Sequence, residues 1–200
     1  MREHRGLRYD VHPEVYEPAE DSFLLADAVL EGLPPGRVLE VGCGTGLVSL
    51  AAARRGARVV AVDVNPFAVR LARRNALAND LPFEVLRGDL LSGLRGDFDA
   101  LLCNPPYLPT AEDDVPSAGR TRLFDAWEAG ARGVDVVLRL LDELAERRVR
   151  ARELWLLTSS LQDEEVIARR LAALGGGGRV IGETKVPWER LRVWKWNLER

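Results

Sequence analysis

The sequence predicts an α/β protein whose mostly parallel sheet is covered by helices on both faces. Short, continuous apolar runs alternate with segments of helical spacing, and the chain closes on two strand-like runs joined by a Pro-Trp turn. Strands that are apolar along their whole length are buried on both faces, as in parallel sheets. A chain of 200 residues, 46% of them hydrophobic, suits one domain over residues 1–200, with residues 1–20 as an N-terminal lead-in.

The helices are predicted from apolar spacing and from their start signals. Ser22–Leu30 carries apolar residues three and four apart, with Asp21 or Ser22 as its N-cap. Asn65 and Pro66 open a helix that runs to about residue 78, because Asn caps a helix and Pro suits its first position. The other predicted helices cover Leu47–Arg55, Gly133–Arg148 and Gln162–Leu174.

The strands are predicted from apolar and β-branched runs bounded by turn residues. The predicted parallel strands are Arg37–Val41, Arg58–Asp63, Phe83–Arg87, Phe98–Cys103 and Leu154–Thr158. Arg179–Val186 and Leu191–Trp196 are expected to form the closing antiparallel hairpin. The stretch Pro105–Phe124 is too long for a plain connector, and loops of that length are more often functional.

Composition excludes several classes of function. A net charge of −3 gives no reason to expect tight binding to a phosphate backbone, and we expect Arg2, Arg5 and Arg8 to lie in a solvated, partly disordered terminus. Cys43 and Cys103 have no metal-site spacing, so neither a metal site nor a disulfide framework is predicted. The longest apolar runs are far short of a membrane span and the start lacks an apolar signal segment, which predicts a cytoplasmic protein.

A glycine-rich loop after the first strand indicates a nucleotide cofactor. Glycines between a strand and its helix let a ligand approach the backbone, and ligands bind at the carboxyl ends of the strands in such sheets. Asp63 ends the next strand, 19 residues after Gly44, and its carboxylate can accept both hydroxyls of a ribose. On this evidence an NAD site remains a rival.

Two details favour S-adenosylmethionine over NAD. The loop reads G-x-G-x-G from Gly42 to Gly46, without the last glycine of the dinucleotide fingerprint. Glu40 precedes the loop, where its charge would repel a pyrophosphate but suits a sulfonium and an amino group. Asp89, after the third strand, is placed to bind the adenine amino group, and Leu90 to contact the same ring. Each carboxylate alone could be a surface or turn residue; the ordered set at strand ends favours the cofactor.

Asn104-Pro105-Pro106-Tyr107 forms a stiff turn at the end of the Phe98–Cys103 strand. The two prolines remove two N–H donors, and Pro105 pushes Asn104 away from helical geometry. The Asn104 side-chain oxygen and the Pro105 carbonyl can accept both hydrogens of a planar –NH2 group, while Tyr107 lies against its flat face. The tetrapeptide alone could also be a proline-rich turn with an Asn cap.

Three segments together resemble the class I S-adenosylmethionine-dependent methyltransferases, and within them the HemK-like glutamine methyltransferases. They are Asn104–Tyr107, Val15–Leu25 and Ala126–Gly133. The first is shared with adenine-N6 and some guanine-N2 methyltransferases of nucleic acids. The second resembles the Y-x-P-x-E-D-[ST]-x-L lead-in of the short eukaryotic and archaeal branch and is more specific. The third resembles A-W-x-G-G-x-x-G, with Ala129 in place of the first Gly.

The resemblance implies a Rossmann-like class I methyltransferase fold with a mostly parallel, seven-stranded sheet and a C-terminal antiparallel hairpin. It implies S-adenosylmethionine as cofactor and no metal. The residues that it places at the cofactor are Tyr16, Ser22, Glu40, Gly42, Gly44, Asp63, Asp89, Leu90 and Asn104. The residues that it places at the acceptor, as catalytic residues, are Asn104, Pro105 and Tyr107.

The activity implied by the resemblance is methylation of the glutamine amide nitrogen in the Gly-Gly-Gln motif of a class I peptide chain release factor. It also implies a small zinc-binding activator that pairs with the sheet edge at Phe83–Leu86. The alternatives are an adenine-N6 or guanine-N2 methyltransferase of DNA or RNA, a protein lysine methyltransferase and an inactive cofactor-binding scaffold. Nucleic-acid enzymes of this kind flip the base out and usually carry a recognition domain or a basic face.

Overall fold

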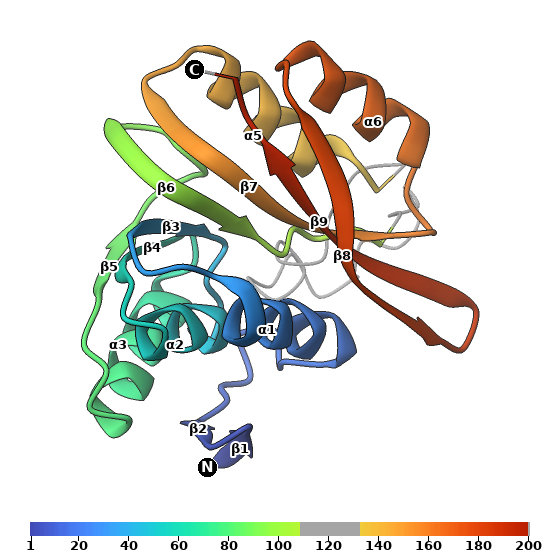
Figure 1. Ribbon diagram of the computed structural model, residues 1–200. Helices are drawn as coiled ribbons and strands as arrows, with labels where there is room; N and C mark the ends of the chain where they lie inside the picture. Colours follow the sequence, from blue (N-terminus) through green and yellow to red (C-terminus); the bar gives the residue numbers. More distant parts are fainter. Residues whose placement is uncertain (109–132, 200) are drawn as a thin grey trace, which may run out of the picture.

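The computed structural model describes residues 1–108 and 133–199, and its centre is a seven-stranded sheet (Figure 1). The order of the strands is β5-β4-β3-β6-β7-β9-β8, with parallel pairing from β5 to β7 and antiparallel pairing of β9 with β7 and β8. The strands are β3 (Arg37–Val41), β4 (Arg58–Asp63), β5 (Glu84–Arg87), β6 (Gly96–Cys103), β7 (Val149–Ser159), β8 (Gly177–Val186) and β9 (Glu189–Asn197). The predicted fold class is confirmed.

Helices cover both faces of this sheet (Figure 1). One face carries α1 (Glu20–Gly32), α2 (Leu47–Arg54) and α3 (Pro66–Ala78), and the other carries α5 (Asp135–Ala145) and α6 (Glu164–Ala173). Neighbouring strand residues alternate between the two cores: Trp155 packs with α1 and α2, whereas Leu154 and Leu156 pack with α5 and α6. All three are buried, so β7 is apolar on both faces, as its sequence predicted.

The order of the strands reverses beside β3. The chain leaves β3 for β4 and β5 on one side and returns to β6 on the other side. The carboxyl ends of β3 and β6 therefore lie next to each other at a topological switch point, where ligands bind in sheets of this kind.

Local signals place the loops beside this point. The Asn65 side chain accepts a hydrogen bond from Phe67 N at 2.9 Å, so the predicted cap of α3 is confirmed. Gly46, at φ +81°, lets α2 pack closely: a Cβ there would lie 3.0 Å from Ala72 Cβ. The predicted cap of α1 is wrong, because the helix begins at Glu20 and the Asp21 carboxylate bonds elsewhere.

The N-terminus forms a hairpin of β1 (Arg2–His4) and β2 (Leu7–Tyr9). Leu7 and Tyr9 are buried against α1 and α2, so the expectation of a partly disordered terminus is wrong, although the three arginines are exposed to solvent as expected. The three arginines have partners: Arg2 pairs with Glu17, Arg5 with Asp27, and Arg8 donates to the Ala78 carbonyl. Alternation of charged and apolar residues in this short stretch was the signal for a strand.

Two asparagines four residues apart, Asn75 in the last turn of α3 and Asn79 at its C-cap, hold the lead-in that follows this hairpin. Asn75 is buried; its Oδ1 accepts from Asp10 N at 2.9 Å, and its Nδ2 donates to the carbonyls of Asp10 and Thr45. Asn79 binds the backbone of Arg8 in the same manner: its Oδ1 accepts from Arg8 N and its Nδ2 donates to Arg8 O, but these contacts lie nearer the surface. Asn75 also reaches the glycine-rich loop through Thr45, so the lead-in and the loop share one anchor.

We expect Asn75→Ala to lower the free energy of unfolding by about 2 kcal/mol, because it leaves buried backbone groups of Asp10 and Thr45 without partners. Asn79→Ala is the matched control; its partners can turn to water, and we expect a loss below about 1 kcal/mol. Urea denaturation of both variants measures the difference. Equal losses would show that burial of the Asn75 contacts contributes nothing special.

Candidate cofactor and acceptor site

A cavity of about 690 Å³ opens at the switch point. Loops after β3, β4, β5 and β6 meet the lead-in and the start of α1 around it. All the residues that the sequence singled out line it: Tyr16, Ser22, Glu40, Gly42, Gly44, Asp63, Asp89, Leu90, Asn104, Pro105 and Tyr107. The structure therefore brings the whole predicted set into one site.

Asp63 ties together the two loops on the β4 side of the cavity. Its Oδ2 accepts from Gly44 N at 2.8 Å, and its Oδ1 accepts from Asn65 N at 2.8 Å. Burial raises the pKa of Asp63, and these two backbone donors oppose the rise by stabilising the carboxylate. Each oxygen keeps lone-pair capacity toward the cavity, which suits a diol.

Glu40 is a buried acid at the end of β3, only 3% exposed. The hydroxyl of Ser49 on α2 donates to its Oε2. Burial raises the Glu40 pKa to about 8, with a smaller contribution from the Asp63 charge in the same direction. At pH 7 the carboxyl is therefore mostly protonated when no cation lies beside it, and a cationic ligand would favour the carboxylate.

The side chain of Asn104 is held in one orientation. Its Nδ2 donates to Asp21 Oδ2 at 3.0 Å and to Ser22 Oγ at 3.3 Å. A carboxylate can only accept, so Asp21 decides which end of the Asn104 amide faces it. The other end, Oδ1, is buried and has no hydrogen-bond partner among residues 1–108 and 133–199. An acceptor of this kind lining a cavity is suited to an incoming N–H donor.

Asp21 is a functional residue that sequence reasoning missed. It is 3% exposed, and it also accepts from Ser22 N at 2.6 Å and from the Tyr16 hydroxyl at 3.2 Å. One carboxylate thus joins the lead-in, α1 and the end of β6. The sequence carried a signal: Asp21 precedes Leu25 by four residues, so an acid occupies the buried face of a helix.

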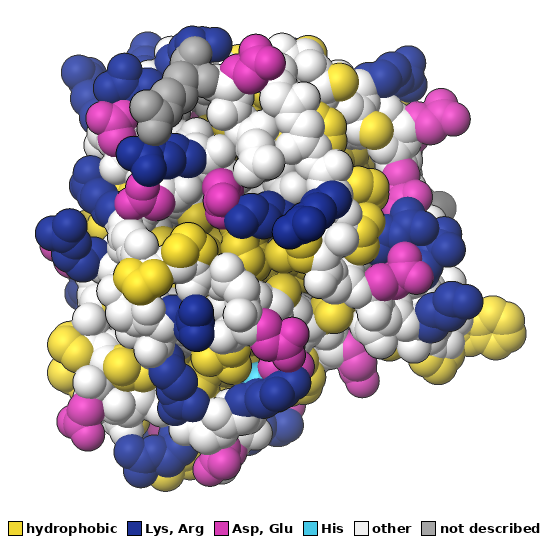
Figure 2. Space-filling model, viewed as in Figure 1, with side chains coloured by type: hydrophobic (Ala, Val, Ile, Leu, Met, Phe, Trp, Pro, Cys, Tyr) yellow, Lys and Arg dark blue, Asp and Glu magenta, His cyan; other side chains and the backbone are white. Residues whose placement is uncertain are grey.

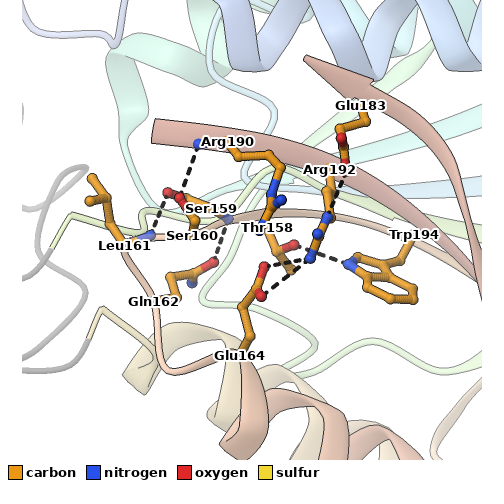
Figure 3. Close-up of polar contacts among 10 residues, drawn as sticks. All are labelled: Thr158, Ser159, Ser160, Leu161, Gln162, Glu164, Glu183, Arg190, Arg192 and Trp194. Carbon is orange, nitrogen blue, oxygen red and sulfur yellow. Dashed lines mark hydrogen bonds and ion pairs between the residues drawn. The ribbon is translucent and has the colours of Figure 1, made fainter. Parts of the chain in front are cut away.

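The backbone of Tyr107 packs against Gly133, just before α5. Gly133, at φ +66°, approaches so closely that a Cβ would lie 2.3 Å from the Tyr107 carbonyl oxygen. The buried Gln162 side chain holds this contact: its Nε2 donates to Gly133 O at 2.7 Å, and its Oε1 accepts from Ser159 N at 3.0 Å. Figure 3 shows Gln162 beside Ser159, in the turn that follows β7.

Burial raises the pKa values of the Tyr16 and Tyr107 hydroxyls, and the nearby Asp21 carboxylate raises both further. Both tyrosines therefore remain neutral at physiological pH, and neither can serve as a proton acceptor there.

Asp89 and Leu90 form the remaining wall. The Asp89 carboxylate accepts from Arg139 Nη2 on α5 at 2.8 Å, an ion pair that is about half exposed. Leu90 is 9% exposed and has φ +48°, an uncommon conformation for a residue other than glycine. Arg139 also lines the cavity and was not expected from the sequence.

Some expectations concern parts of the chain with few structural facts. The segment Ala126–Arg132, which carries most of the third family-like motif, lies outside the described residues, as does most of Pro105–Phe124. Among residues 1–108 and 133–199, no group of three or more His, Cys, Asp or Glu side chains could hold a metal ion. Cys43 and Cys103 are buried free thiols. No helix within the described part of the chain is long and apolar enough to cross a bilayer.

The sequence is similar to those of known methyltransferases. Residues 20–124 match the family model of the methyltransferase small domain. A putative protein N5-glutamine methyltransferase from Methanocaldococcus jannaschii is 40% identical over 94% of both chains. A release factor glutamine methyltransferase from Moorella thermoacetica is 37% identical over 70% of this chain, which spans about half (53%) of that longer relative.

A solved structure has the same fold along nearly its whole length. It is the E. cuniculi Mtq2-Trm112 complex, described as responsible for the methylation of the eRF1 translation termination factor. The match has a TM-score of 0.73 and 27% identity, and covers 93% of this chain and 99% of that one. The chain belongs to the methyltransferase small domain family, in its HemK-like group of protein glutamine methyltransferases.

Proposed function

We propose that this protein transfers a methyl group from S-adenosylmethionine to the side-chain amide nitrogen of the glutamine in the Gly-Gly-Gln motif of a class I peptide chain release factor. The observation that carries the proposal is the buried, unpaired Oδ1 of Asn104 in the cavity, beside Pro105 and Tyr107. The relatives named as glutamine methyltransferases support the choice of acceptor.

The residues of the cavity fit the proposed cofactor. Asp63 would accept from the ribose hydroxyls, Glu40 would face the cationic part, and Asp89 and Leu90 would contact the adenine. Gly44, at φ +52°, has nothing within 4 Å of the place where a Cβ would lie, so the loop leaves room for a ligand against its backbone. When bound, S-adenosylmethionine supplies an electrophilic methyl group.

Orientation is the main contribution of the acceptor residues. An amide nitrogen is a poor nucleophile because its lone pair is delocalised. Asn104 Oδ1 and the Pro105 carbonyl would accept the two N–H groups and turn the nitrogen toward the methyl donor, a near-attack arrangement. These hydrogen bonds strengthen as positive charge develops on the nitrogen. As the new N–CH3 bond forms, the S–CH3 bond breaks and leaves a neutral thioether, and the nitrogen then loses one N–H proton to solvent. Asp21 keeps the Asn104 amide in the orientation that this task requires.

We also propose a small partner subunit at the edge of the sheet. β5 is an edge strand, as predicted, although it begins at Glu84 rather than Phe83, and Leu86 is 39% exposed there. An added strand would satisfy its free backbone groups. The Mtq2-Trm112 complex supports a two-chain assembly. Because release factors act at cytoplasmic ribosomes, we place the protein in the cytoplasm.

We expect a release factor co-expressed with this protein to gain the mass of one methyl group on the glutamine of its Gly-Gly-Gln motif. Fragmentation mass spectrometry of the digested release factor locates the modification. Release factor from cells that lack the protein is the control. Transfer of labelled methyl groups to RNA or DNA but not to the release factor would contradict the proposal.

Asn104→Ala tests the assignment of the acceptor residue. We expect methyl transfer to fall below detection, because the variant removes one of the two acceptors that orient the amide. Cofactor affinity should stay within roughly tenfold, or about 1.4 kcal/mol. A tritiated-methyl assay and calorimetric titration measure the two effects, with Asn79→Ala as a control outside the cavity. Retained turnover in Asn104→Ala would overturn the assignment.

Glu40→Gln tests the charge beside the cofactor. With a Glu40 pKa of about 8, wild-type protein at pH 7 should release a proton when a cation binds, so its cofactor affinity should rise with pH and level off above about pH 8. The Gln variant should bind more weakly, without proton release and with a flat pH profile. Titration calorimetry in two buffers of different ionisation enthalpy detects the proton. Identical heats for the wild-type protein in both buffers would contradict this role.

A further inference from the structure

The end of the β8–β9 hairpin extends beyond the carboxyl edge of the sheet, on the side where the acceptor residues lie (Figure 1). Cys103, which ends β6, is level with Leu156 and through it with Trp194. β9 begins five residues earlier, at Glu189, which pairs with Val186 at the tip. Because an antiparallel strand rises about 3.4 Å per residue, these residues carry the tip about 17 Å past the end of β6.

The hairpin is fixed to the body one residue away from Glu189 (Figure 3). Ser160 N donates to Arg190 O, and Arg190 N donates to Ser160 Oγ, both at 2.9 Å. Arg192 bridges Glu164 on α6, at 3.1 Å, and Glu183 on β8, at 2.9 Å. The turn after β7 and the start of α6 thus fix the position of the hairpin close to its tip.

The tip carries a large aromatic side chain that the fold does not use. Trp188 is 94% exposed and has φ +68°, a conformation that costs free energy for a residue other than glycine. Figure 2 shows hydrophobic atoms projecting from the body at the end of this hairpin. Tryptophan in such a position is typical of binding anchors, because burial in a partner recovers a large apolar area.

Glu189, the residue after Trp188, faces the acceptor site. Glu189 Oε1 is buried but has no hydrogen-bond partner in the part of the chain that the structure describes. Val186, which pairs with Glu189, packs on the same buried cluster as Tyr107, so the tip and the acceptor turn share one apolar core. After burial and Asp21, the Glu189 charge also contributes to the raised pKa values of Tyr16 and Tyr107. An unpaired carboxylate oxygen beside the acceptor turn can accept an N–H group from a bound molecule.

We propose that Trp188 and Glu189 form a docking surface for the polypeptide that carries the acceptor glutamine. Trp188 packs against an apolar surface of the substrate protein, and Glu189 accepts an N–H group of the segment that flanks the acceptor. The charge of the tip does not select the occupant, because Lys185 and Arg190 pair next to Glu189; the relatives named as protein glutamine methyltransferases favour a polypeptide. This inference rests on the proposed function, since the acceptor residue inside the cavity requires its chain to lie along the rim.

Steady-state methyl transfer to an intact release factor tests the docking surface, with the full chain, any subunit that co-purifies with it, and saturating S-adenosylmethionine. We expect Trp188→Ala to raise the KM for the release factor about tenfold, with kcat and cofactor affinity within about twofold, as for loss of an anchor in binding. Trp188→Phe should restore most of the affinity. Val180→Ala, an exposed apolar residue near the other end of β8, is the matched control.

Glu189→Gln should also raise the KM, because a neutral oxygen accepts a weaker hydrogen bond. Melting temperatures of the variants verify that they fold. Wild-type turnover on the release factor with an unchanged KM in both Trp188→Ala and Glu189→Gln would overturn the docking surface alone. No transfer to the release factor by the wild-type protein would overturn the proposed function and the docking surface with it.

Discussion

The hydrogen bond between Asp21 and Asn104 is the contact on which the rest of the site depends. It joins the first turn of α1 to the end of β6 across 83 positions of the chain and fixes which end of the Asn104 amide enters the cavity. Both Asp21 and its neighbour Ser22 are buried, so the local dielectric strengthens the bond. A rotated amide would place two N–H donors at the acceptor position, where they would repel an incoming –NH2 group.

The sheet topology brings the two halves of the site together. Reversal of the strand order beside β3 makes its glycine-rich loop and the turn after β6 neighbours. Residues from both faces of the sheet fix the turn after β6. On one side, the first turn of α1 binds the Asn104 side chain; on the other, Gln162 binds Gly133, which packs against the Tyr107 carbonyl. Two acids, the buried Glu40 and the half-buried Asp63, make the cavity receptive to a cation.

Sequence patterns were sufficient for the elements and for most of the site. The apolar strands, the Asn65 cap and the closing hairpin agree with the structure because each depends on local propensity or on burial of a whole face. The errors concern positions where tertiary contacts override local preference. Asp21 has the side chain of a helix cap but is drawn to Asn104 instead. The arginine-rich terminus is ordered because Leu7 and Tyr9 bury against α1 and α2.

The sequence by itself determined the fold class, the ends of the strands at which ligands bind, and eleven of the residues that line the cavity, although not Asp21 or Arg139. These follow from periodicity, turn chemistry and motif, which are properties of neighbouring residues. Only the tertiary structure decided how those residues are aimed: the unpaired Asn104 Oδ1, the raised Glu40 pKa and the packing of Val186 at the β8–β9 tip on the same cluster as Tyr107. Orientation, burial and pKa depend on groups that are distant in the chain, and no local pattern records them.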